Sequence, residues 1–180
     1  KLLNLLVRIS GARRVLEIGT LGGYSTIWMA RAVGEHGRVV TVEAEAGNAA
    51  IARASIDAAG GGDGVEIRVG RAADVLPRMN EASYDIVLVD ADAEGVIEYV
   101  EHGLRLVRAG GTVLVPRALR GGAVADPVRR DPITTAFRSL IEETQASPAV
   151  LGALSIVGEG LLQLTTVPGD GVGVSYGDTF

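Results

Sequence analysis

VLEIGTLGGYST, residues Val15 to Thr26, is the stretch that decides the fold. A short apolar run is followed by glycines and then by apolar residues at helical spacing, which predicts a buried parallel strand leading into a helix. Between the two, Gly19, Gly22 and Gly23 allow the backbone to turn sharply and to come close to a ligand. The exposed amides at the start of the next helix favour an anionic group there. The stretch therefore predicts a ligand-binding loop.

The same alternation of strand and helix continues along the chain on both sides of this loop. Strands are expected at 14–18, 38–43, 65–69, 84–90 and 112–115, and helices at 24–33, 46–59, 72–79, 95–107 and 133–144, with a turn at 108–111. Two further apolar stretches, 150–156 and 161–167, are expected to pair as an antiparallel hairpin. Strands that alternate with helices imply a doubly wound, mostly parallel α/β sheet. We expect one domain over residues 1–167 and a loose, glycine-rich tail over 168–180.

Composition excludes several classes of function. The 180 residues include no cysteine, which excludes a disulfide scaffold, a thiolate metal site and a cysteine nucleophile. Seventeen basic and 22 acidic residues give a net charge of −5 without a cluster of positive charge, so we expect neither nucleic acid nor a membrane as partner. Lys1 is the only lysine, which excludes an interior lysine base. With no signal peptide or membrane span in the sequence, we expect a cytoplasmic protein.

Polar residues at the predicted strand ends are the candidates for chemistry, because doubly wound sheets bind ligands beyond the carboxyl ends of their strands. The first loop has the spacing G-x-x-G-G rather than the G-x-G-x-x-G of dinucleotide folds, which favours a smaller anion such as an amino-acid carboxylate. Ser25 would add a hydroxyl to that carboxylate. Glu43 ends the second strand, where a carboxylate can accept both hydroxyls of a ribose. Asp90 ends the fourth strand, within VDAD, and would face the reacting end of a bound cofactor.

Five segments taken together resemble a known family. VLEIGTLGGYST, TVEAE, GRAADVLP, YDIVLVDAD and GLRLVRAGGTVLV are similar to the class I S-adenosylmethionine-dependent methyltransferases, and within them to the catechol and caffeoyl-CoA O-methyltransferases. The similarity implies a Rossmann-like sheet of seven strands, S-adenosylmethionine as cofactor, methyl transfer to a small hydroxylated acceptor, and a homodimer. The cofactor-binding residues that it implies are Glu17, Gly19, Thr20, Ser25, Glu43, Ala72, Ala73 and Asp90.

The resemblance also assigns each of these residues a part of the cofactor. Glu17 and Ser25 would meet the methionine end, with main-chain help from Gly19 and Thr20. Glu43 would hold the ribose, and Ala72 and Ala73 would border the adenine. Asp90 would face the methionine amino group and the acceptor.

The chain departs from the family where the family binds its divalent cation. Family members use the aspartate of VDAD, an Asp-Asn pair after the fifth strand, and a lysine base three residues after that aspartate. Here the aspartate is Asp90, but Ala93 stands at the lysine position and Pro116-Arg117 replace the Asp-Asn pair. The sequence therefore predicts no metal site, and it leaves Asp90 and Arg117 as the candidate catalytic residues.

Three interpretations of this departure stay open. Arg117 can replace the cation by pairing with a phenolate or carboxylate of the acceptor. Alternatively, catalysis rests on proximity alone, with an acceptor acidic enough to ionise by itself. In the third interpretation the protein binds S-adenosylmethionine without transferring its methyl group, as a binding or regulatory module. A nicotinamide oxidoreductase is disfavoured by the glycine spacing and by the absence of a Tyr-x-x-x-Lys pair.

Overall fold

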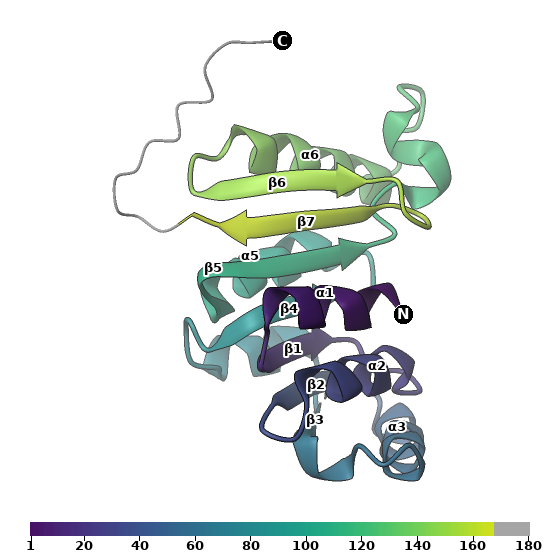
Figure 1. The fold of residues 1–180 in the computed structure, drawn as a ribbon. Coiled ribbons are helices and arrows are strands. Elements are labelled where there is room, and N and C mark those ends of the chain that lie inside the picture. Colours follow the sequence, from purple (N-terminus) through teal and green to yellow (C-terminus); the bar gives the residue numbers. More distant parts are fainter. Residues whose placement is uncertain (168–180) are drawn as a thin grey trace.

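The computed structural model describes residues 1–167, in which seven strands form one sheet with helices on both faces (Figure 1). The strand order is β3-β2-β1-β4-β5-β7-β6. The strands are β1 (Arg14–Ile18), β2 (Arg38–Glu43), β3 (Val65–Val69), β4 (Tyr84–Val89), β5 (Val107–Pro116), β6 (Val150–Ser155) and β7 (Leu161–Thr166). Strands β1 to β5 are parallel, and β7 pairs antiparallel with both β5 and β6. This confirms the predicted doubly wound sheet and its C-terminal hairpin; the predicted loose tail lies outside the described residues.

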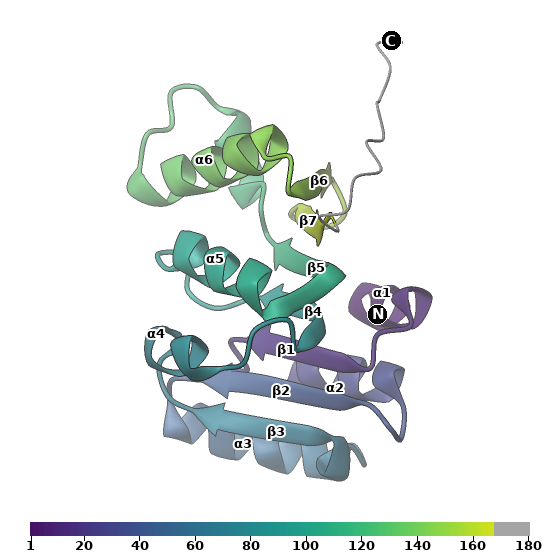
Figure 2. The ribbon, with the colours of Figure 1, turned by 90° about the vertical axis from the view of Figure 1, so that its left-hand side faces the viewer.

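Two layers of helices cover the sheet (Figure 2). One face carries α1 (Leu2–Ser10), α2 (Tyr24–Val33) and α3 (Ala46–Ala58), and the other carries α4 (Ala72–Val75), α5 (Val96–Leu106) and α6 (Pro132–Ala146). Short 3₁₀ turns, η1 (Gly62–Gly64), η2 (Leu76–Arg78) and η3 (Arg120–Ala125), lie in the connections. No helix within residues 1–167 has the length and apolar character that a bilayer-spanning segment needs.

Alternate residues of the central strands enter two separate cores. In β1, Leu16 and Ile18 face the core under α5 and α6, whereas Val15 faces the core under α1 to α3. All three side chains are fully buried, and burying one such side chain contributes about 1.5–3 kcal/mol. Because both faces are covered, these strands are continuous apolar runs. That pattern explains why the sequence predicted β1, β2 and β3 with the bounds that the structure shows.

Two predicted elements differ in the structure, each because of a residue with special backbone properties. The helix expected at 72–79 stops at Val75 and continues as the 3₁₀ turn η2, which contains Pro77, a residue without an amide hydrogen. The turn expected at 108–111 belongs to β5 instead. There the pairing with β4 shifts register, and Gly110 takes a positive φ of 72° that lets the extra residues bulge out of the ladder.

The topology places a binding cleft between β1 and β4, where the strand order reverses. Gly19 follows β1 and Asp90 follows β4, and the Asp90 amide donates to the carbonyl oxygen of Ile18 at 2.9 Å. A Cβ atom on Gly19 would lie 2.5 Å from the carbonyl oxygen of Asp90, and the φ of Gly19 is 96°. Only glycine therefore allows the two chain segments to cross this closely.

Candidate active site

A cavity of about 600 Å³ opens at the carboxyl ends of β1 to β4, and its size is that of a typical small-molecule site. Four of the predicted site residues, Gly19, Glu43, Ala72 and Asp90, line this cavity. Thr20, Ser25, Ala73 and Glu17 lie in the same loops and strand ends without lining it. Arg117 lines a second, smaller hollow that shares Ala91 and Asp92 with the cavity.

The Glu43 carboxylate is a fixed anion at the wall of the cavity. Its Oε2 accepts from the amide of Leu21 at 2.8 Å and from that of Thr20 at 3.3 Å, and its Oε1 accepts from the amide of Glu45 at 3.0 Å and from Asn48 Nδ2 at 3.4 Å. Burial raises the pKa of Glu43, but these hydrogen bonds outweigh it and hold the pKa below its usual value. Glu43 is therefore ionised at neutral pH, and it also ties the glycine loop to the end of β2.

The Glu17 carboxyl lies beneath the glycine loop and is fully buried. It accepts hydrogen bonds from the hydroxyls of Ser25 and Thr26, and from that of Thr41 at 2.7 Å. The Thr41 hydroxyl also shares a hydrogen bond of 2.5 Å with the Thr20 hydroxyl. Burial raises the pKa of Glu17 to about 7, even though the three hydroxyls act in the opposite direction. Glu17 thus braces the loop from below, and the Ser25 hydroxyl is directed to it.

Substituting Glu17 tests this raised pKa. The native state keeps a proton that the unfolded chain releases between about pH 4.5 and 7, so native stability from this group is full at low pH and is lost as pH rises through about 7. The unfolding free energy of the wild type should therefore fall by about 3 kcal/mol relative to that of Glu17→Gln between pH 4.5 and 7.5. Urea unfolding followed by the fluorescence of Trp28 measures the difference.

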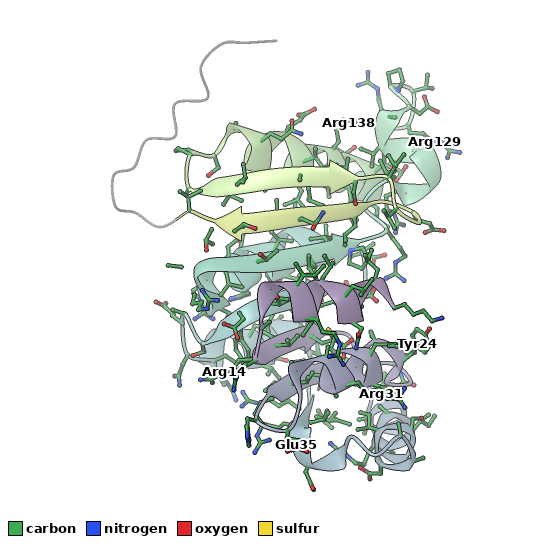
Figure 3. The ribbon with its side chains drawn as sticks, viewed as in Figure 1. Arg14, Tyr24, Arg31, Glu35, Arg129 and Arg138 are labelled. Atoms are coloured by element: carbon green, nitrogen blue, oxygen red, sulfur yellow. The ribbon has the colours of Figure 1, made fainter. Side chains whose placement is uncertain are left out.

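The exposed Glu35 (Figure 3) provides the matched control for this experiment. Glu35→Gln should show the same pH dependence as the wild type. Parallel curves for the wild type and Glu17→Gln over the whole range would contradict the raised pKa of Glu17.

Asp90 and Arg117, the two candidate catalytic residues, are in direct contact. They follow the neighbouring parallel strands β4 and β5, and Arg117 Nη2 donates to Asp90 Oδ1 at 2.5 Å. Burial raises the pKa of Asp90, and the Arg117 guanidinium partly offsets this. The backbone of Arg117 has a φ of 57°, in the left-handed region where side-chain-bearing residues are uncommon. Strain of this kind concentrates at functional sites.

The donor atoms at this point do not fit a divalent cation of the magnesium type, which requires about six oxygen ligands. Pro116 offers no side-chain ligand, and the guanidinium of Arg117 already occupies Asp90. Asp92 is also engaged, because its Oδ1 accepts from the Gly95 amide at 3.0 Å and its Oδ2 from the Tyr99 hydroxyl at 2.8 Å. Within residues 1–167, no group of three or more His, Asp or Glu side chains could hold a metal ion. Metal-free catalysis stays a prediction.

Some residues that line the cavity were missed by the sequence reasoning. Leu21 contributes its amide to Glu43, and a main-chain contribution leaves no signal in the residue type. Tyr99 reaches the cavity from the first turns of α5, whose start at the end of the β4 loop is the signal that could have found it. Arg71 precedes α4 and lines the cavity beside Ala72.

Fold and cavity together define the class of protein. A doubly wound sheet with a glycine-rich loop after β1 and a buried carboxylate at the end of β2 is typical of proteins that bind a nucleoside-containing cofactor at the strand ends.

Known proteins identify the family. Residues 1–166 match the family model described as O-methyltransferase. The chain is 47% identical over 124 residues to a catechol O-methyltransferase of Mycobacterium tuberculosis, a match that covers 69% of this chain and 56% of that protein. It is 38% identical over 170 residues to a catechol O-methyltransferase of Niastella koreensis, covering 93% of this chain and 74% of that protein.

A solved structure agrees with these matches. The O-methyltransferase of Streptomyces achromogenes involved in tomaymycin synthesis, in complex with S-adenosylmethionine, superposes with a TM-score of 0.85 at 39% identity, over 93% of this chain and 78% of that chain. The chain belongs to the O-methyltransferase family. Membership confirms the prediction from sequence of a class I methyltransferase of the S-adenosylmethionine-dependent type.

Proposed function

We propose that this protein transfers the methyl group of S-adenosylmethionine to a hydroxyl oxygen of a small, catechol-like or phenol-like acceptor, without a catalytic divalent metal. The observation that carries the proposal is the pairing of Arg117 with Asp90 at the rim of the cavity. The Arg117 guanidinium is a cation that lines the second hollow, next to the Ala91 and Asp92 walls that this hollow shares with the cofactor cavity. The catechol O-methyltransferases among the relatives support an acceptor with aromatic hydroxyls.

The residues around the cavity fit the parts of this cofactor. Glu43, ionised and lining the cavity, accepts the ribose hydroxyls in addition to the hydrogen bonds that it already accepts from the glycine loop. Ala72, which lines the cavity, borders the adenine with a small side chain that leaves room for a flat ring, and Ala73 follows it in α4. Gly19 lines the cavity and offers its main chain to the methionine end. Beside it, the Thr20 amide is held by Glu43 and the Ser25 hydroxyl by Glu17. Asp90 balances the methionine ammonium group. When bound, the cofactor supplies the methyl group and its sulfur as leaving group.

The chemistry of the acceptor depends on Arg117. Its guanidinium favours the ionised form of the acceptor hydroxyl, whose proton passes to solvent, and it holds the oxygen near the methyl carbon. Bound S-adenosylmethionine would supply the methyl carbon for the new bond to that oxygen, and its sulfur would leave with the electron pair of the broken carbon–sulfur bond. Asp90 orients the guanidinium through the 2.5 Å contact. Alignment of oxygen, carbon and sulfur supplies the rest of the rate enhancement.

Calorimetry tests the cofactor part of the proposal. S-adenosylmethionine and S-adenosylhomocysteine, titrated separately into the purified protein, should bind with micromolar dissociation constants that are the same in excess chelator and in magnesium. NADH should show no heat of binding. Failure of both methionine-derived ligands to bind would contradict the proposed function.

We infer in addition that the protein forms a homodimer through the β6–β7 hairpin. This hairpin carries apolar side chains that are exposed to solvent: Leu151 is 55% exposed, Ile156 84% and Val157 55%. Exposed apolar groups of this kind mark interaction surfaces. The cytoplasmic location expected from the sequence stays a prediction.

Sedimentation velocity tests the dimer. Ile156→Glu combined with Leu151→Glu should convert a dimer into monomers, because two charges on each protomer would be buried without partners. Val128→Glu is the control, since Val128 is 81% exposed on a different segment and its change should leave the dimer intact. A wild type that sediments as a monomer would contradict the inference.

A further inference from the structure

The segment that follows β5 is basic in an otherwise acidic protein. From Arg117 to Arg130 it carries four arginines and one aspartate, against a net charge of −5 for the whole chain. Arg129, labelled in Figure 3, lies at the end of the sheet where β5 ends, on the same side as Tyr24 of the glycine-loop helix. The basic segment therefore stands at the edge of the sheet that holds the cofactor cavity.

Arg138 of α6 fixes the backbone of this segment. Its Nε donates to the carbonyl oxygen of Val124 at 3.2 Å, and its Nη2 donates to those of Asp126 at 3.1 Å and Arg129 at 3.2 Å. One side chain thus holds three successive parts of the loop against α6. These hydrogen bonds hold in place the backbone of the segment that carries the arginines.

Arg120 is the oriented cation within the segment. Its guanidinium lies over the ring of Phe137, with Cζ 5.4 Å from the ring centre, and its backbone φ is 51°. Among residues 1–167, no carboxylate lies within salt-bridge distance of Arg120. Asp126, the one acid of the segment, accepts instead from the amide of Val128 at 3.0 Å. The charge of Arg120 is held in place and is not neutralised.

A narrow hollow of about 20 Å³ joins Arg120 to the reaction site. Arg117, Arg120, Phe137 and Val96 are among its walls. The space suits one small polar group and is too small for an aromatic ring. The carboxylate of Asp92, on the same wall, is already held by Gly95 and Tyr99.

We propose that Arg120 binds a carboxylate substituent of the acceptor, so that the protein prefers hydroxylated aromatic acids over uncharged catechols. The proposal rests on the proposed function, because it concerns the acceptor of that reaction. A planar guanidinium with two parallel donors matches a carboxylate in geometry and charge. The contact with Phe137 holds the guanidinium in position in advance, and Arg117 then meets the reacting hydroxyl of the same acceptor.

Two probes that differ in one charge test this assignment: 3,4-dihydroxybenzoate and 3,4-dihydroxybenzamide. Each is titrated into the protein saturated with S-adenosylhomocysteine, and each is assayed for methyl transfer. The benzoate should bind about tenfold more tightly than the benzamide, as expected for one hydrogen-bonded charge pair at a partly exposed site. In the methyl-transfer assay, the KM for the benzoate should be lower than the KM for the benzamide, and the KM for S-adenosylmethionine should be the same with both acceptors.

Variants separate Arg120 from the general charge of the segment. Arg120→Gln should remove the preference for the benzoate, and Arg120→Lys should restore part of it. Arg130→Gln removes the same charge from an exposed position of the same segment and should keep the preference.

The outcomes are distinct. Equal affinity for the two probes, binding of neither probe, or an Arg130→Gln effect as large as that of Arg120→Gln would each overturn the carboxylate subsite. The proposed function fails separately, in the first titration, if S-adenosylhomocysteine itself does not bind.

Discussion

Glu43→Gln is expected to raise the dissociation constant of S-adenosylmethionine about a hundredfold, because a hydrogen bond to a charged group contributes about 1.5–3 kcal/mol and the ribose offers two hydroxyls. The substitution also weakens the acceptors for the Leu21 and Thr20 amides, which at present tie the glycine loop to β2. Calorimetric titration with the cofactor measures the change.

Glu45→Gln is the matched control for Glu43→Gln. The Glu45 side chain is exposed two residues further on, so its change should leave the dissociation constant within about twofold of the wild type. Thermal unfolding of both variants shows whether the fold is kept. An unchanged affinity in folded Glu43→Gln would contradict the ribose contact.

Arg117→Met is expected to lower kcat for methyl transfer about 10²- to 10³-fold, the usual loss when one group that stabilises a developing or bound oxyanion is removed. The affinity for S-adenosylmethionine should be retained or improved, because Asp90 is then free to balance the methionine ammonium. Arg117→Lys should recover part of the rate, since it keeps the charge but loses the planar fork.

The control for Arg117→Met is Arg130→Met, on the same segment and exposed, which should keep kcat within about twofold. A wild-type kcat in Arg117→Met would contradict the assignment of Arg117 to the acceptor oxygen. It would favour catalysis by proximity alone.

Much of the fold could be predicted because burial on both faces leaves a strong pattern. β1, β2 and β3 are apolar runs between glycines and charges, and the structure shows them at the predicted bounds. The errors at α4 and β5 came from local chemistry. Pro77 removes an amide, and Gly110 takes a left-handed conformation that lets a bulge continue the strand.

The site was predictable only in part. The rule that ligands lie at the strand ends identified Gly19, Glu43 and Asp90, all of which line the cavity. Contacts between distant residues were not predictable, because spacing in the sequence does not encode them. The hydrogen bond from the Thr41 hydroxyl to the buried Glu17 carboxyl is one such case. The position of Arg120 over Phe137, which lies in another element, is a second.

Transfer of a labelled methyl group from S-adenosylmethionine, measured in excess chelator and in magnesium, tests metal-free catalysis most directly. The acceptors are 3,4-dihydroxybenzoate and a panel of phenols and catechols. The expected result is turnover of at least one acceptor, at the same rate in both conditions, with S-adenosylhomocysteine formed in equal amount. Turnover that requires magnesium, or tight binding of the cofactor with no transfer to any acceptor, would contradict it.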